Sequence, residues 1–185
     1  MTFRGFVAVD VPSTPALDTF AADLRKASPS LKVVATDQLH LTVKFLGETE
    51  DGLVPEIGTA IREAVEGLAP FKIRVRGTGA FPSLSRMNVI WVGVEGAEPI
   101  ARVAEALEVS LEPLGFPREN RPWTAHVTLA RVKGYRDLDR ARQLVEAHVS
   151  DGFGDHTVHT IHLKKSVLTP EGARYSVVDT IPFSA

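Results

Sequence analysis

The sequence predicts an α+β fold built from two related halves, with mainly antiparallel sheets and helices on the outer faces of those sheets. Strand-like and helix-like patterns alternate along the 185 residues, and several of the strands are polar on one face only. The spacing between matching elements is nearly constant, at 84, 86 and 87 positions for Phe6 and Ile90, His40 and His126, and Phe71 and Val158. Constant spacing indicates an internal duplication.

This duplication defines the expected domain organisation. We expect a single domain, residues 1–185, made of two intimately packed lobes related by a pseudo-twofold axis. The repeat halves are approximately residues 1–86 and 87–185. A length of 185 residues is sufficient for one well-buried core of this kind.

The first half has the order strand, helix, strand, helix, strand. Residues 6–11 are apolar or alternate as a strand does, and Pro12 to Pro15 provide turn and N-cap signals. An apolar stripe at Leu17, Phe20, Ala21 and Leu24 then predicts a helix, which Ser28-Pro29 ends. The same criteria predict a strand at 31–35, a strand from His40 to Leu46-Gly47, a helix at 57–68 and a strand at 71–75.

The second half repeats this order and adds further strands. Apolar patterns predict a strand at 87–94, a helix at 100–111, a strand at 126–132 and a helix at 138–148. The tail is predicted to form strands at 158–163, 166–168 and 175–181, with Pro170-Glu171-Gly172 as a turn between the last two.

Composition excludes several classes of protein. The chain is 44% hydrophobic with a formal net charge of -2, so it is not a generally basic nucleic-acid binder, and any polyanion must meet a local cluster of Lys and Arg. The absence of cysteine excludes disulfides, thiolate metal sites and a cysteine nucleophile. Neither a signal peptide nor an apolar run of membrane-spanning length is recognised. We expect a cytoplasmic monomer without membrane contact.

The most informative motif is a histidine and a threonine two residues apart, which occurs twice. His40 and Thr42 project from one face of their strand, and His126 and Thr128 do the same in the second half. An imidazole has a pKa of about 6.5 and transfers protons near neutrality, while a hydroxyl beside it can bind an oxygen anion. Two such pairs indicate one proton-transfer site assembled from two halves.

The chain resembles the LigT-like branch of the 2H phosphoesterase superfamily, the RNA 2′,3′-cyclic phosphodiesterases also called 2′-5′ RNA ligases. The resemblance covers nearly the whole chain. Val43 and Ala125 are mild departures, because the family more often has Leu and Pro there. The segments that carry the resemblance are residues 37–47, Phe81-Pro82-Ser83, residues 89–93, Arg121-Pro122, residues 126–131 and residues 166–175.

This resemblance implies a bilobal fold with both histidines facing a central groove, and an enzyme that acts on RNA ends or nucleotides bearing a 2′,3′-cyclic phosphate. Its product is a 2′-phosphomonoester, and reversible 2′-5′ joining of RNA ends is a possible side activity. The family analogy makes His126 the general base and His40 the general acid. Thr42, Thr128 and Arg131 then contact the phosphate oxygens. No metal and no cofactor are expected.

Strand parity also indicates where three residues close to these motifs point. Arg131 lies at an odd offset from His126, so a bulge, a twist or the end of the strand near Ala130 must turn it toward the histidine face. Lys44 shares the parity of His40 and is a candidate phosphate-binding residue, although a solvated lysine is an equally good interpretation. Phe45 has the parity of Leu41, so we expect it in the core rather than stacked on a base.

Other histidines suggest a metal site that the pattern does not support. His156, His159 and His162 alternate between the two faces of a strand, so the three cannot converge on one ion. Arg86, Arg118, Arg121, Lys164 and Lys165 could form a basic rim for an RNA end. Two other functions remain open: a phosphodiesterase for small cyclic nucleotides or 2′-5′ dinucleotides, and a non-catalytic module that binds RNA ends.

Overall fold

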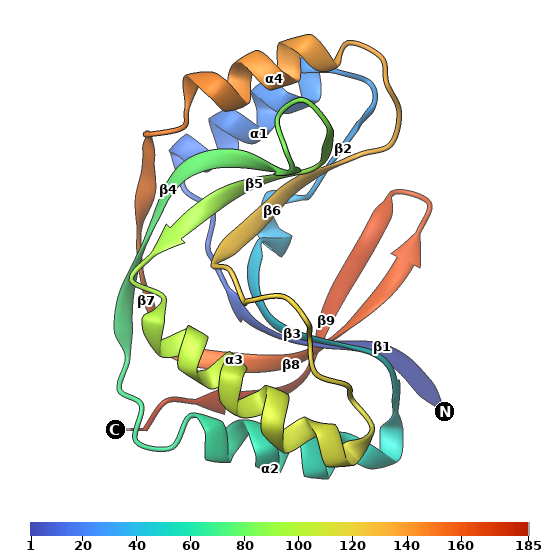
Figure 1. The fold of residues 1–185 in the computed structure, drawn as a ribbon, viewed down its shortest axis with the longest axis vertical. Coiled ribbons are helices and arrows are strands. Elements are labelled where there is room, and N and C mark those ends of the chain that lie inside the picture. Colours follow the sequence, from blue (N-terminus) through green and yellow to red (C-terminus); the bar gives the residue numbers. More distant parts are fainter. Residues whose placement is uncertain (185) are drawn as a thin grey trace.

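The structure is a computed structural model that describes residues 1–184, and it confirms the predicted α+β class (Figure 1). Four α-helices accompany the strands: α1 (Pro15–Ala27), α2 (Val54–Ala64), α3 (Glu98–Leu111) and α4 (Leu138–Ala147). The strands are β1 (Thr2–Asp10), β2 (Leu31–Val33), β3 (His40–Glu50), β4 (Phe71–Pro82), β5 (Met87–Glu95), β6 (His126–Val132), β7 (Gly152–Val158), β8 (Thr160–Thr169) and β9 (Gly172–Pro182).

All the strand pairs are antiparallel. Hydrogen-bonded strands follow the order β7-β4-β5-β6-β3-β1-β8-β9, and β2 pairs with β6 beside this path. Most neighbouring strands share long ladders, but β3 and β6 meet at the single pair Leu41 and Val127. The sheet is therefore divided at this point into two parts that can curve independently.

Each part of the sheet with its helices forms one lobe. The β5–β6 lobe consists of β7, β4, β5, β6 and β2, with α1 and α4 packed together on its outer side (Figure 1). The β1–β3 lobe consists of β3, β1, β8 and β9, covered by α2 and α3. These lobes do not coincide with the sequence halves, because each contains one helix and at least one strand from either half.

The strands differ from the sequence expectation in two regions. The strand expected at 71–75 continues to Pro82, because a register shift between Val75 and Thr78 includes Gly77 at φ 78° and interrupts the alternation. In the tail, β7 (Gly152–Val158) forms where no strand was expected, and β8 (Thr160–Thr169) joins the strands expected at 158–163 and 166–168 into one.

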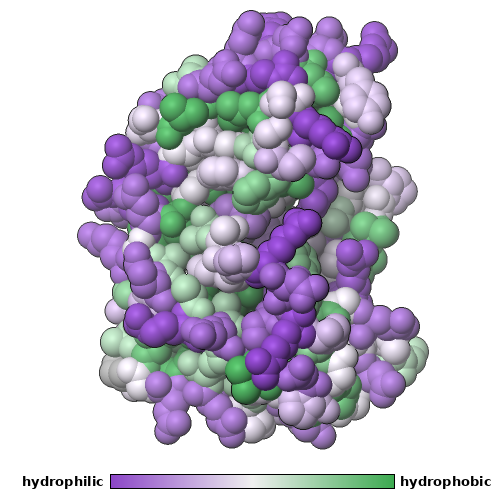
Figure 2. Space-filling view, in the orientation of Figure 1, coloured by the Kyte–Doolittle hydropathy of each residue, from purple (hydrophilic) through white to green (hydrophobic). Residues whose placement is uncertain are grey.

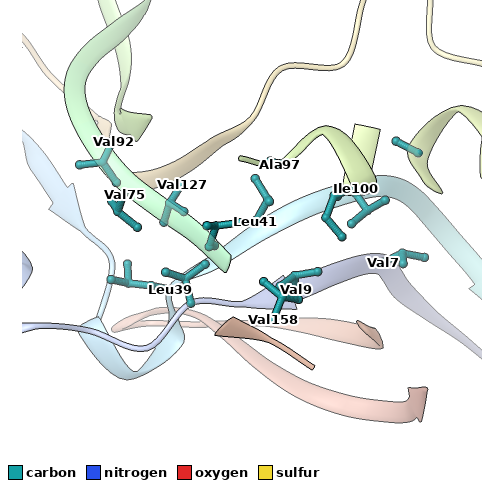
Figure 3. Packing of buried hydrophobic residues seen from close by; sticks show 14 of the residues in the cluster. Val7, Val9, Leu39, Leu41, Val75, Val92, Ala97, Ile100, Val127 and Val158 are labelled. Atoms are coloured by element: carbon teal, nitrogen blue, oxygen red, sulfur yellow. The ribbon is translucent and has the colours of Figure 1, made fainter. Parts of the chain in front are cut away.

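The hydrophobic core lies between the sheet and the helices and continues across the β3–β6 contact (Figure 3). Leu41 and Val127 are fully buried and pack near Val9, Val92 and Ile100. Burying a side chain of this size contributes about 1.5 to 3 kcal/mol. The strand faces opposite to this core are consequently left for the polar residues of the site.

The N-terminus of α1 shows how a helix is fixed to the sheet. The Thr14 hydroxyl accepts a hydrogen bond from the Leu17 amide at 3.2 Å and donates one to the Phe153 carbonyl of β7 at 2.6 Å. Pro15 occupies the first helical turn, where its missing amide hydrogen costs nothing. This cap joins α1 from the first half of the chain to a strand from the second half.

In Figure 2, pale and green residues appear in the middle of the view, between α4 above and α2 and α3 below, and a band of purple, hydrophilic residues crosses them. No helix within residues 1–184 is long and apolar enough to cross a membrane.

Candidate active site

The two predicted histidine–threonine pairs lie on one common face of the sheet. His40 and His126 are the first residues of β3 and β6, each one position before the paired residues Leu41 and Val127. In an antiparallel pair this register brings each histidine toward the threonine of the other strand. We call this surface the histidine face, and define it by His40, Thr42, His126, Thr128 and Arg131.

Arg131 reaches the histidine face through the expected bulge. The β5–β6 register shifts between Ile90 and Trp91, so that Leu129 and Ala130 are buried in succession and Arg131 is exposed. Burial is the main cause that lowers the pKa of His40 and His126, and the positive charge of Arg131 lowers both pKa values further.

The first half contains the same bulge, and this corrects two sequence expectations. The β1–β3 register shifts between Val7 and Ala8, so Val43 and Lys44 are buried in succession. Phe45 consequently emerges with a 57% exposed side chain, so its predicted core position is wrong. Phe45 is the counterpart of Arg131, 86 positions earlier.

Lys44 does not lie on the histidine face, so its prediction as a phosphate-binding residue is wrong. Its side chain is 1% exposed, and Nζ donates to Glu108 Oε2 at 2.9 Å and to the Pro117 carbonyl at 3.1 Å. The Glu119 amide donates to the same glutamate oxygen at 2.9 Å. Lys44 thereby fastens α3 and the segment after it to β3.

That segment leads directly to His126 and is fastened a second time by Trp123. The indole Nε1 donates to the Thr42 carbonyl at 3.0 Å, which joins the residues before β6 to the backbone of the strand that carries the other histidine–threonine pair. Trp123 is therefore a structural link between the two strands.

Both imidazoles are oriented in the same way. Nδ1 of His40 lies 3.0 Å from the Gln38 carbonyl, and Nδ1 of His126 lies 3.1 Å from the Thr124 carbonyl, each two residues before the histidine. A carbonyl only accepts, so Nδ1 must carry the hydrogen, and the neutral ring then presents the Nε2 lone pair. Each histidine is thus ready to take or give a proton at Nε2.

The two rings lie against aromatic side chains. His40 packs against Phe6 and the edge of Tyr175, with ring centroids 5.1 and 4.9 Å apart, and His126 packs edge-on against Phe81 at 5.0 Å. Burial lowers the pKa of both histidines below the ordinary value of 6.5, and the carbonyl hydrogen bonds oppose this shift in part.

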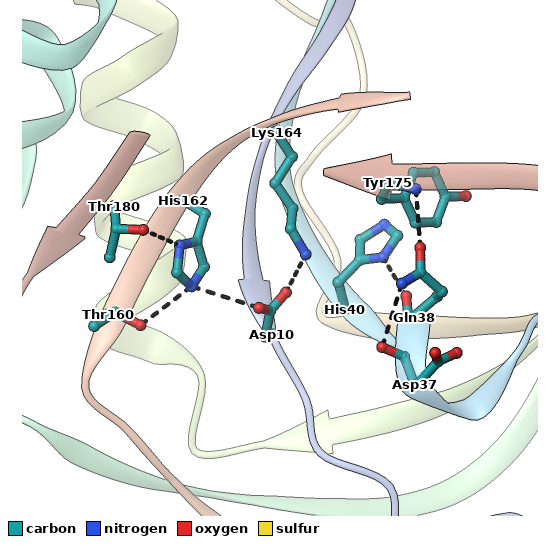
Figure 4. Close-up of polar contacts among 9 residues, drawn as sticks. All are labelled: Asp10, Asp37, Gln38, His40, Thr160, His162, Lys164, Tyr175 and Thr180. Atoms are coloured by element: carbon teal, nitrogen blue, oxygen red, sulfur yellow. Dashed lines mark hydrogen bonds and ion pairs between the residues drawn. The ribbon is translucent and has the colours of Figure 1, made fainter. Parts of the chain in front are cut away.

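His40 has a second layer of support that sequence reasoning missed (Figure 4). The Tyr175 amide donates to Gln38 Oε1 at 2.9 Å, so the residue whose carbonyl orients His40 is itself held by β9. The available signal was that Gln38 and Thr124 occupy equivalent positions, two residues before each histidine.

A charged group lies beside His40 on the same face. Lys164 donates a short hydrogen bond to Asp10, and Asp10 Oδ2 lies 3.5 Å from Nε2 of His162 (Figure 4). Lys164 is only 7% exposed, so it does not belong to the predicted solvent-exposed basic rim. Its charge lowers the pKa of His40, and that of Asp10 raises it.

Three of the other four histidines line a hollow beside Asp10. His156, His159 and His162 surround it although strand alternation was expected to separate them, and its volume is about 170 Å³. The break between β7 and β8 at His159 interrupts that alternation. Within residues 1–184 no three His, Asp or Glu side chains are grouped closely enough to hold a metal ion.

Comparison with known proteins identifies the family. Residues 11–167 match the model of the 2′-5′ RNA ligase superfamily. The chain belongs to this superfamily. A relative from Methanothermobacter thermautotrophicus, named RNA 2′,3′-cyclic phosphodiesterase, is 33% identical over 178 residues, which are 95% of this chain and 96% of that one. A relative of the same name from Archaeoglobus fulgidus is 34% identical over 174 residues, which are 93% of this chain and 96% of that one.

Solved structures from the superfamily have the same fold. A crystal structure of a Thermus thermophilus protein matches with a TM-score of 0.78 and 30% identity, covering 97% of each chain. Escherichia coli LigT, solved with 3′-AMP, matches with a TM-score of 0.69 and 22% identity over the full length of both chains. The second likeness concerns the fold alone.

The buried position of Lys44 predicts a stability effect. Lys44→Met keeps the length of the side chain but removes the positive charge that pairs with the Glu108 carboxylate, so the free energy of unfolding should fall by about 3 kcal/mol. Chemical denaturation followed by circular dichroism measures this change. An unaltered free energy of unfolding together with weaker substrate binding would instead support Lys44 as a phosphate-binding residue.

Proposed function

We propose that this protein hydrolyses the 2′,3′-cyclic phosphate at RNA ends to a 2′-phosphomonoester, using His40 and His126 as an acid–base pair and no metal ion. The observation that carries the proposal is the duplicated geometry: two imidazoles on one face, each with Nδ1 fixed by a carbonyl and with Nε2 making no hydrogen bond to protein within residues 1–184. The relatives named RNA 2′,3′-cyclic phosphodiesterase support the same hydrolase activity.

The proposed reaction is an in-line displacement at phosphorus. His126 takes a proton from water as the water oxygen bonds to phosphorus, and His40 gives a proton to the 3′ oxygen as its bond to phosphorus breaks. The phosphate then remains on the 2′ oxygen. When an RNA 5′-hydroxyl takes the place of water as the nucleophile, the same departure of the 3′ oxygen joins two ends through a 2′-5′ linkage.

The other residues of the histidine face can stabilise the charge that develops in this reaction. The hydroxyls of Thr42 and Thr128 make no hydrogen bond to protein within residues 1–184, so they can donate to the non-bridging oxygens. Arg131 is exposed on the same face and supplies a compensating positive charge. The exposed ring of Phe45 offers an apolar surface to a nucleoside.

The first experiment tests the histidine pair. His40→Ala and His126→Ala should each lower kcat by about a hundred- to ten-thousand-fold, the usual value of a general acid or base. The assay follows an oligonucleotide with a 2′,3′-cyclic phosphate in excess chelator and identifies the position of the phosphate in the product.

His159→Ala provides the matched control, because His159 is exposed and lies outside the histidine face. This variant should retain wild-type turnover. The circular dichroism spectra of all three variants, His40→Ala, His126→Ala and His159→Ala, should match the wild-type spectrum. Near-normal turnover in either of the other variants, or activity that requires added divalent metal, contradicts the mechanism.

The pH dependence follows from the direction of the pKa shifts. The free enzyme needs one neutral and one protonated histidine, so kcat/KM should be bell-shaped between two macroscopic pKa values of the pair. Since burial lowers both pKa values, the optimum of kcat/KM should lie below pH 6.5. Bound anionic phosphate raises both pKa values, so the optimum of kcat should lie at higher pH. Steady-state kinetics across the pH range measures both; coincident optima above pH 6.5 would refute this account.

The order of the two roles can be tested with a better leaving group. Sulfur in place of the 3′ oxygen leaves as a thiolate, whose conjugate acid has a pKa of about 8.5, and therefore needs no proton from the enzyme. This substrate should restore turnover to His40→Ala and leave His126→Ala inactive. Restoration in His126→Ala alone would reverse the assignment.

A further inference from the structure

The loop between β6 and α4 presents an exposed aromatic side chain between two basic residues. Tyr135 is 94% exposed, and Lys133 and Arg136 on either side of it are exposed as well. A single exposed apolar residue requires no explanation by itself. The backbone beneath Tyr135 and its position relative to the histidine face distinguish it from other exposed residues.

The backbone of this loop is held by two buried serines. The Lys133 amide donates to the Ser30 carbonyl at 2.7 Å, and the Arg136 amide donates to Ser30 Oγ at 2.8 Å. The Ser28 hydroxyl donates to the Arg136 carbonyl at 2.5 Å. Because the backbone is fixed on both sides of Tyr135, little further ordering is required when a planar ligand stacks on its ring.

The loop continues directly from the strand that carries half of the histidine face. Arg131 is the fourth residue before Tyr135, so at most about 14 Å of chain separates them. Arg131 is also the ladder partner of Lys32 in β2. Exposed positive charges therefore extend from the histidine face to the loop.

The positive charges around the hollow are already paired, Lys164 with Asp10 and Arg74 with Asp155 of β7. Within residues 1–184, by contrast, no ion pair involves Arg131, Lys133 or Arg136. These three charges therefore remain available to a polyanionic strand that leaves the histidine face.

The β8–β9 hairpin lies near this path. Lys32 Nζ donates to the carbonyl of Pro170, in the turn between β8 and β9, at 3.3 Å. This hydrogen bond connects β2 of one lobe to the hairpin of the other. The β6–α4 loop and the hairpin therefore lie on one side of the molecule (Figure 1).

We propose that Tyr135, Lys133 and Arg136 form a second binding site that takes the single-stranded RNA upstream of the cyclic phosphate. One base stacks on the ring of Tyr135, and the backbone phosphates lie against Lys133 and Arg136. Aromatic side chains combined with nearby positive charge bind single strands in this way without reading sequence. This inference rests on the proposed function, since it assigns the remainder of that substrate.

The test compares a nucleoside 2′,3′-cyclic monophosphate with a short oligonucleotide that ends in the same nucleotide. Tyr135→Ala should raise KM for the oligonucleotide about tenfold, the loss expected for one stacked base, with kcat unchanged. The kcat/KM for the mononucleotide should stay at the wild-type value, and Tyr135→Phe should retain oligonucleotide binding. Equal effects on both substrates, or none on the oligonucleotide, overturn the proposal.

The positive charges require a separate measurement. Lys133→Ala and Arg136→Ala should each reduce the salt dependence of oligonucleotide binding, by about 0.7 in the slope of log K against log salt. Arg102→Ala is the matched control, because Arg102 is exposed on α3 in the other lobe. An equal reduction in that control shows general charge attraction and contradicts a defined site.

A binding experiment distinguishes failure of this inference from failure of the proposed function. Fluorescence anisotropy with a labelled oligonucleotide that ends in a 2′-phosphate requires no turnover. Wild-type binding that Tyr135→Ala weakens about tenfold supports the site even in a protein without hydrolytic activity. Equal binding by wild type and variant overturns the site even where hydrolysis is normal.

Discussion

The single contact between β3 and β6 determines how the rest of the site is arranged. Leu41 and Val127 are buried on one side of this contact, so the residues before and after them must face the other side. A long ladder between β3 and β6 would have held the two lobes together as one continuous surface. One pair instead allows the two lobes to curve apart while His40 and His126 remain near their common boundary. The bulge that follows each motif then brings one more residue to the same face.

The two halves share the backbone geometry around the histidines but differ in the side chains that follow each motif. Both histidines are oriented by the carbonyl two residues earlier, and both motifs are followed by two consecutive buried residues. The positions after the bulge differ: Phe45 in one half corresponds to Arg131 in the other. One half of the face therefore offers an aromatic surface and the other a positive charge. A nucleotide has both an apolar base and an anionic phosphate, so an asymmetric face suits it better than a symmetric one would.

The sequence was sufficient to predict the fold class, the alternation of elements and the common face of the two histidine–threonine pairs, because these depend on local periodicity and on repetition. An irregularity before Arg131 was predicted, as a bulge, a twist or a strand end, because parity alone contradicted its expected role; the structure has a bulge there. The identical bulge before Phe45 was missed, since no functional requirement exposed a conflict there. The burial of Lys44 could not be foreseen, because its partner Glu108 is 64 residues away. Gln38 and Tyr175 were missed for the same reason, being joined by a hydrogen bond between distant segments.

The distribution of each sequence half over both lobes bears on how the chain acquires its structure. Helix α1 is made early in synthesis, but it packs against α4 and is capped onto β7, which emerge much later. Strand β1 likewise pairs with β8. Neither half alone contains the partners needed to bury its apolar surface, so stable structure requires nearly the whole chain to be available. Such a dominance of contacts between distant segments is associated with slow folding. A nascent chain of this protein would therefore remain exposed to aggregation and to chaperones for most of its synthesis.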